Sequence, residues 1–333
     1  MGRIEGQRSV RAAAGARHGA GRRTLALILL LLPLLAITAA PLQARNVPGS
    51  VLGSLGGTIT ATTDTLVSGV TGTLDRPGCE ADLAAGRFCL GVTAGAQQIT
   101  GDGLRGDALT GSAVIAFRLD SGADVFAGFL GERLRARTSF DAGRIDGRGH
   151  GLAFGARVPL GEGVALTGTG LLMRLDYDVS RNAGADRGSF RGERGVADLR
   201  IEWRNRVPSG RFSADIGLRY VRQNNDGYTE SSGAAVGASR FEHFELIMAG
   251  RHVWAGEGLR PYLQGDLAVV LSRNSNLPPG ILAGTTQSSR VRLGAGFEQV
   301  IDGRSSLDLG IGATLGGGGS AAGDIRLSYA LRF

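Results

Sequence analysis

The chain has 333 residues, of which 42% are hydrophobic, 20% are charged and only 6% are aromatic, which fits one large folded domain or two small ones. The formal net charge is +7, but six arginines and one glutamate, a net +5, precede residue 45 and leave only +2 for the rest. Because no basic stripe with interleaved aromatic residues remains, we expect no nucleic-acid partner.

Residues 1–44 have the pattern of a secretory signal peptide. A basic region is followed by an apolar run over residues 25–40 that contains Pro33, and small residues offer cleavage sites after Ala40 or Ala44. The alternative is a transmembrane anchor, but the run is short for about 30 Å of hydrocarbon and contains a proline. We therefore expect export through a cleaved signal peptide.

Residues 45–85 form a short leader, near the end of which lies the first of the two cysteines in the chain, Cys79 and Cys89. In an oxidising periplasm we expect these cysteines to form a disulfide that closes a short loop. A metal site would need further ligands, and no histidine lies in this region. We expect neither a metal nor another cofactor.

From about residue 110 to the end, apolar and polar residues alternate with a period of two, so each run has one apolar and one polar face. In the last run, for example, Leu327, Tyr329, Leu331 and Phe333 share the apolar face. Most runs exceed the ~5–6 residues usual in soluble sheets and reach the ~9–11 residues that a tilted strand needs to cross a bilayer. Eleven such strands are predicted, near residues 111–119, 123–135, 148–160, 163–178, 190–205, 210–222, 238–254, 259–273, 288–301, 304–315 and 323–333.

The connections between these runs alternate in length. Short turns are expected near 120–122, 161–163, 208–210, 255–258 and 302–303, and longer polar loops near 136–147, 179–189, 223–237, 274–287 and 316–322. This asymmetry is typical of bacterial outer-membrane barrels, whose strand number is even. Alternation over residues 90–96 supplies a twelfth strand. We predict an all-β fold, a membrane-spanning antiparallel up-and-down barrel of twelve strands within residues 86–333.

The polar faces of the predicted strands carry many charges. A charge in a soluble core is costly, and an arginine at mid-membrane facing lipid costs ~2–4 kcal/mol, so these faces should surround a wet lumen while the apolar faces contact outer-membrane lipid. A soluble sandwich with its charged faces in water fits the alternation strand by strand, but the strand lengths and loop asymmetry favour the membrane. The expected lumen charges include Arg200, Glu202, Asp215, Arg219, Asp266, Arg292 and Asp308, and also Arg174. They would form either a salt-bridge lattice that fills the pore or an ion-selective path.

Several segments resemble a known family. The C-terminal YALRF, with Tyr329 and Phe333, resembles the signal read by the barrel assembly machinery of the outer membrane. Residues 148–273 resemble the β-domain of autotransporters, most clearly in LDYDVSR (175–181), ADIGLRYVRQNNDGYTESSGAAV (214–236) and LRPYLQGDLAVV (259–270). The resemblance implies twelve strands and a translocator that helps its own N-terminal passenger to reach the cell surface of a Gram-negative bacterium.

The resemblance also implies a helix that runs through the lumen to the first strand. Apolar residues between Val51 and Leu74 recur near helical spacing, and 24 residues at 1.5 Å each would span ~36 Å. The same segment is rich in glycine and threonine, which are poor helix formers. A helix, an extended strand and a disordered leader all remain open for residues 46–75.

Little or no passenger is expected, because only 45–60 residues precede the barrel once the signal is removed. Two other functions stay open: a small-solute pore, and a surface protein whose loops bind an extracellular ligand. We predict that the chain is not an enzyme, because nothing in the sequence fixes a nucleophile beside a base, and the four histidines lack metal-ligand spacing.

Overall fold

The computed structural model describes residues 51–74, 79, 87–101, 104–138, 142–276, 289–316 and 320–333. The predicted signal peptide and much of the leader therefore lie outside the described residues. One long helix, α2 (Val51–Leu74), precedes the strands. Among the described residues, no helix is both long and apolar enough to cross a membrane.

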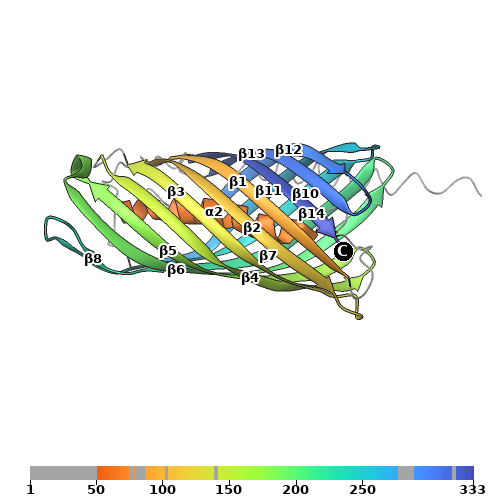
Figure 1. The fold of residues 1–333 in the computed structure, drawn as a ribbon, viewed down its shortest axis with the longest axis horizontal. Coiled ribbons are helices and arrows are strands. Elements are labelled where there is room, and N and C mark those ends of the chain that lie inside the picture. Colours follow the sequence, from red (N-terminus) through yellow and green to blue (C-terminus); the bar gives the residue numbers. More distant parts are fainter. Residues whose placement is uncertain are drawn as a thin grey trace, which may run out of the picture. The chain divides into compact units, whose positions relative to one another are not determined.

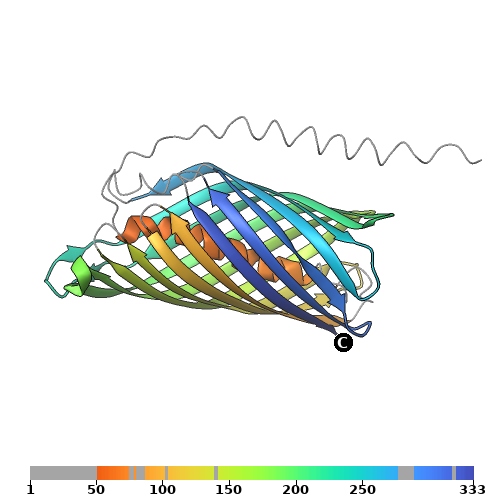
Figure 2. The ribbon, with the colours of Figure 1, turned by 90° about the horizontal axis from the view of Figure 1, so that it is seen from above.

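Twelve strands close into an antiparallel barrel (Figures 1 and 2), as the alternation predicted. They are β1 (Phe88–Gly101), β2 (Leu104–Arg118), β3 (Asp124–Thr138), β4 (Arg144–Gly161), β5 (Val164–Arg181), β6 (Asp186–Val207), β7 (Gly210–Asn225), β10 (Ser239–Trp254), β11 (Leu259–Ser275), β12 (Ser289–Val300), β13 (Ser305–Gly316) and β14 (Ala321–Arg332). Each strand pairs with its neighbours in the barrel order, and β1 pairs with β14 to close the ring, with Val92 opposite Tyr329. Closure leaves no sheet edge, so no backbone group in the wall has to face lipid unpaired.

The strands are longer on one side of the ring than the alternation predicted. β4 and β5 have 18 residues each and β6 has 22, so that most of the loops expected at 136–147 and 179–189 are strand. What remains of the second is a 3-10 turn, η1 (Asn182–Gly184). The predicted loop at 223–237 contains a small hairpin of β8 (Tyr228–Thr229) and β9 (Ala235–Val236). The polar residues do not end these strands, because the antiparallel hydrogen bonding between neighbouring strands extends beyond the membrane.

Burial along the strands alternates as a barrel wall requires. On the outward face Phe129 is 72% exposed, Leu172 60% and Leu293 66%. A continuous belt of exposed large apolar side chains is not stable in water. The belt contacts the membrane, and the buried alternate positions face inward.

The prediction was wrong for one lumen residue. Arg174 is exposed on the outer face of β5, because its neighbours Met173 and Leu175 are the residues that point inward and are buried. Beyond the lipid belt, toward the end of the barrel that carries the long loops, the interior lined by β2–β6 is an apolar core. There the apolar residues of these strands point inward and the charged residues point outward. The apolar face of a strand therefore points outward only in the part of the strand that crosses the membrane.

The two ends of the barrel differ. The short turns and the C-terminus lie at one end, and hairpin β8–β9 lies at the other (Figure 1). Gly122 (φ 82°) and Gly163 (φ 70°) allow two of the tight turns, since other residues rarely adopt such angles. Short turns are periplasmic and long loops are extracellular in outer-membrane barrels. The hairpin end is therefore the outer end.

Candidate functional site

Helix α2 lies inside the barrel (Figure 2) and contacts β1 to β5 and β14. Its apolar residues Ile59, Leu66, Val67 and Val70 are each at most 2% exposed and join the apolar core formed by β2 to β6. This burial explains why a glycine- and threonine-rich segment is helical, because tertiary packing supplies most of the stability of a helix in a protein.

Two threonines of α2 satisfy their hydroxyl groups through local hydrogen bonds within the helix. The Thr71 hydroxyl donates to the Val67 carbonyl at 2.9 Å, and the Thr73 hydroxyl donates to the Gly69 carbonyl at 3.2 Å. Such bonds satisfy a buried hydroxyl without a partner outside the helix. Small side chains therefore let the helix lie against the wall without leaving these polar groups unpaired.

Glycines bring α2 close to β1. A Cβ built at Gly95 would lie 3.1 Å from Thr65 Cγ2, and one at Gly91 would overlap the side chain of Thr73. Since Gly91 is near the beginning of β1 and Thr73 is near the end of α2, the helix runs antiparallel to β1. The N-terminal end of α2 thus points to the outer end of the barrel.

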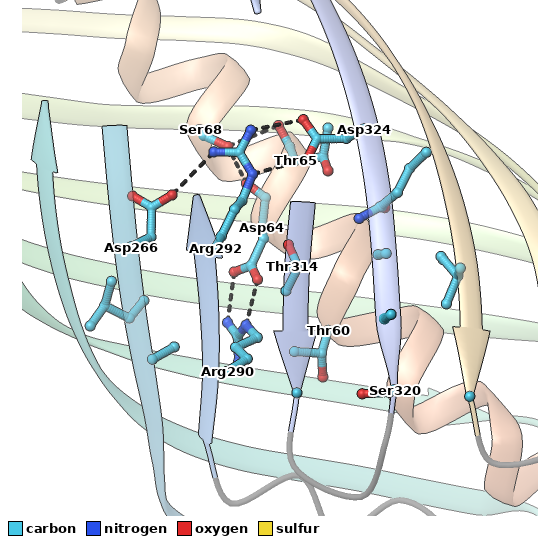
Figure 3. Close-up of a pocket in the computed structure, with 18 of the residues that line it drawn as sticks. Thr60, Asp64, Thr65, Ser68, Asp266, Arg290, Arg292, Thr314, Ser320 and Asp324 are labelled. Carbon is cyan, nitrogen blue, oxygen red and sulfur yellow. Dashed lines mark hydrogen bonds and ion pairs between the residues drawn. The ribbon is translucent and has the colours of Figure 1, made fainter. Parts of the chain in front are cut away.

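Asp64 is the only charged residue of α2, and it is ion-paired to two arginines of the wall, Arg290 (Figure 3) and Arg219. Arg290 of β12 donates to both carboxylate oxygens, from Nε at 2.6 Å and from Nη2 at 2.8 Å. Arg219 of β7 also donates to Oδ1. This bidentate, charge-assisted geometry is among the strongest polar contacts available to a side chain.

Each of these arginines has a second acidic partner in the wall. Arg290 makes two hydrogen bonds to Glu245, at 2.6 and 2.9 Å, and Arg219 donates to Asp198 at 2.8 Å. Both arginines are more than 90% buried. The wall thus holds the guanidinium groups in position, and Asp64 completes their neutralisation from the helix.

A second polar contact lies nearer the outer end. Arg194 of β6 is 3% exposed, and its Nη1 donates to Thr62 of α2 at 3.1 Å and to Glu132 at 2.7 Å. Its Nε donates to Gln223, which in turn donates to the hydroxyl of Tyr177. The helix is therefore tied to the wall on two sides, once through Asp64 and once through Thr62.

Apart from Arg174, the residues proposed from the sequence for the lumen lie in ion pairs of the inner wall. Arg219 and Arg200 share Asp198, and Arg200 also bonds Asp215 at 3.0 Å. Arg292 lies between Asp266 (3.1 Å) and Asp324 (2.7 Å), close to the helix. Glu202 and Asp308 pair away from α2, with Arg157 at 3.1 Å and Arg251 at 2.7 Å respectively.

Sequence reasoning did not select Asp64, Arg290, Arg194 or Glu132. One signal was available: a single charge in an otherwise uncharged 24-residue segment needs a partner if the segment is buried. Its partners lie 155 and 226 residues away, so no local pattern identifies them. Within the described ranges no cluster of three or more histidine, cysteine or acidic side chains could hold a metal ion.

A cavity of about 120 Å³ remains beside the helix. Its lining includes Thr60, Asp64 and Ser68 of α2, and it faces Arg292 and Asp324 of the wall (Figure 3). A buried water needs roughly 10–15 Å³ of such space, so the cavity has room for several waters and for no folded segment. With α2 in place this part of the lumen is largely filled, whereas a wider cavity of about 400 Å³ lies at the short-turn end, where its lining includes Arg118, Arg157 and Arg211.

The remaining proposed residues lie at the end that carries the short turns. Phe333 stacks on Phe88 with ring centroids 4.8 Å apart, and its N–H donates to the Phe88 carbonyl at 3.0 Å. Tyr329 points outward and is 39% exposed. Cys79 and Cys89 are disulfide-bonded, which links the segment after α2 to the beginning of β1.

A closed twelve-strand barrel with its preceding helix in the lumen can be compared with known proteins. The family model of the autotransporter β-domain matches residues 90–322, more than half of the chain. This chain belongs to the autotransporter β-domain family.

Solved structures support the same fold. The autotransporter barrel described here is similar to the translocator domain of autotransporter NalP from Neisseria meningitidis, at 16% identity and a TM-score of 0.68 over 83% of this chain and 98% of that one. It is also similar to the β-domain of the Bordetella autotransporter BrkA, at 18% identity and a TM-score of 0.51 over 74% and 99%. No curated protein matches the sequence. The chain is an outer-membrane autotransporter translocator barrel, which is a transport domain.

Proposed function

We propose that this translocator retains its own leader helix as a plug after the N-terminal segment has crossed the barrel. The observation that carries the proposal is the pairing of Asp64 with Arg219 and Arg290, because it ties a helix from before the barrel to the far wall of the lumen. The antiparallel course of α2 along β1 directs the residues before it to the outer end.

We propose further that residues 1–44 are a cleaved signal peptide, that residues 45–85 are the leader, and that residues 86–333 are the barrel. In this proposal the barrel has no enzymatic activity of its own. The barrel assembly machinery would recognise the C-terminal strand through Tyr329 and Phe333, which lie on its outward face. Insertion into lipid follows from the outer-membrane barrel itself.

Conductance of the whole chain in planar bilayers tests the plug. The full chain is expected to show only small, brief openings, whereas a chain lacking residues 51–74 is expected to conduct steadily. A stable open channel that this deletion leaves unchanged would contradict the plug and favour the small-solute pore.

Surface labelling tests the direction of the leader. A cysteine introduced at Asn46, in a Cys79→Ser/Cys89→Ser background, should react with an impermeant thiol reagent added to intact cells. A cysteine introduced at Ser121, in a turn at the other end of the barrel, serves as the matched control and should stay unlabelled until the outer membrane is permeabilised. The reverse pattern would refute an outward leader.

A further inference from the structure

The outer face of β2–β5 changes character at one level of the barrel. Up to that level the outward residues are apolar, with exposed fractions of 54% at Leu109, 72% at Phe129, 52% at Leu152 and 60% at Leu172. Beyond it, toward the outer end, the next outward side chains are charged or polar. These are Asp107 and Arg105 on β2, Arg133, Arg135 and Arg137 on β3, His150, Arg148, Asp146 and Arg144 on β4, and Arg174, Asp176 and Asp178 on β5.

Three of these residues form an arginine cluster, defined as Arg133, Arg148 and Arg174. Arg133 lies directly opposite Arg148 in the β3–β4 register, and Arg174 lies opposite His150, two residues further along β4. Directly opposite side chains in an antiparallel pair have Cβ atoms about 4.5–5.5 Å apart, and diagonal neighbours lie about 7–8 Å apart. The cluster thus places three guanidinium groups and one imidazole on one small area.

The three arginines of the cluster form no ion pair within the described part of the chain. Asp176 and Glu193 lie opposite Arg148 and Arg174 in the registers, yet neither forms an ion pair with them, and Asp176 is 3.7 Å from Arg191 instead.

Some other outward arginines near the rim do have acidic partners, although Arg105 and Arg137, which lie opposite each other on β2 and β3, form no ion pair among the described residues either. Arg135 lies 3.8 Å from Asp146, and Glu242 pairs with both Arg222 and Arg240. Like charges directly opposite each other destabilise a sheet. An anion bound from outside the protein would relieve the repulsion between Arg133 and Arg148.

We propose that the arginine cluster binds a phosphate group of a phosphorylated glycolipid in the outer leaflet. The planar guanidinium group matches the oxygens of a phosphate in bidentate geometry. The apolar residues directly below, from Leu109 to Leu172, provide a surface for acyl chains. The position of the cluster, at the upper edge of the lipid belt and on the long-loop side, is the level of outer-leaflet headgroups.

This inference uses only the outward face and the orientation of the barrel, so it is independent of the plug. It commits to a lipid headgroup. Free inorganic phosphate has no acyl chains and would gain nothing from the apolar surface below the cluster.

The test is native mass spectrometry of the full chain folded in detergent micelles, titrated with a bis-phosphorylated, acylated glucosamine disaccharide. The same glycolipid without its phosphates, and inorganic phosphate alone, are the two comparison ligands. Each arginine near an anionic surface contributes roughly a fivefold factor in binding, so Arg133→Gln/Arg148→Gln/Arg174→Gln should weaken retention of the phosphorylated lipid about 100-fold. The single variant Arg148→Gln, expected to lose about fivefold, keeps the test decisive if the triple variant does not fold.

The matched control is Arg135→Gln/Arg222→Gln/Arg240→Gln, which removes the same charge from arginines that have acidic partners. It should change retention by less than about threefold. Arg148→Gln should also raise the midpoint of thermal unfolding in lipid-free detergent, because it removes the like-charge pair. Equal loss in both triple variants, equal retention of the dephosphorylated lipid, or equal retention of inorganic phosphate would each overturn the proposal.

Discussion

Replacement of Asp64 by asparagine separates the charge that holds α2 from the packing that holds it. The asparagine side chain keeps the shape and one hydrogen-bond acceptor but removes the ion pairs to Arg219 and Arg290. Arg290 retains Glu245 and Arg219 retains Asp198, so no wall arginine loses all of its acidic partners. The substitution therefore acts on the docking of the helix and leaves the wall intact.

The magnitude follows from the burial of the helix. Ile59, Leu66, Val67 and Val70 are almost fully buried, and each contributes ~1.5–3 kcal/mol, so apolar packing supplies about 6–12 kcal/mol. A hydrogen bond to a charged group contributes ~1.5–3 kcal/mol. The Asp64 side chain is 30% exposed to the lumen, which favours the lower end of that range, about 1.5 kcal/mol.

A loss of about 1.5 kcal/mol raises the open fraction of the barrel roughly tenfold and does not expel the helix. Single-channel recording in planar bilayers should therefore show more frequent openings of Asp64→Asn with an unchanged open conductance. The control is Asp308→Asn, which removes a lumen carboxylate whose partner Arg251 keeps Glu298 and does not contact α2. Openings of Asp64→Asn as rare as in wild type, or an equal increase in both variants, would refute the assignment of Asp64 as the anchor.

Three further predictions concern packing, buried charge and assembly. Gly91→Val should overlap Thr73 and displace the helix at a cost of ~1–3 kcal/mol, visible as increased conductance that Thr73→Ala partly reverses; no change would contradict the close approach. Arg194→Met leaves the 7% exposed Glu132 without its cation and should destabilise the barrel by ~3–5 kcal/mol in the heat-dependent gel shift, and adding Glu132→Leu should recover most of the loss if the unpaired charge is the cause. Phe333→Asp removes the ring stacked on Phe88 and should leave the barrel uninserted, so normal heat-modifiable migration would count against a role of this residue in assembly.

The twelve strands could be predicted because side-chain direction in a strand is a local property: residues i and i+2 share a face whatever the rest of the chain does. The same rule failed at Arg174, and it underestimated the length of β5 and β6. It assumes that apolar always means lipid-facing, and above the membrane the apolar residues of β5 point into the lumen instead. Depth in the bilayer is a property of the assembled barrel, which no single strand encodes.

The leader shows more clearly how local sequence properties differ from properties of the assembled barrel. Its composition left helix, strand and disorder open, because glycine and threonine oppose a helix as strongly as the apolar spacing favours one. In the barrel the choice is made by the four apolar side chains that join the apolar core of the wall, the Gly91–Thr73 approach and the pairs of Asp64. Each of these contacts joins residues that are distant in the chain, except at the beginning of β1.

The sequence by itself determined that the chain forms a ring of membrane-crossing strands, each with one apolar and one polar face. The period of two and the alternation of short and long connections depend only on the order of the residues in the chain. Only the tertiary structure decided which charges meet, that a helix lies in the lumen, and that Arg133, Arg148 and Arg174 gather on the outer rim without forming an ion pair with any residue that the structure describes. The physical reason is that ion pairs and packing depend on distances across the closed barrel. Those distances are fixed by strand order and register, and they exist only after the first strand has paired with the last.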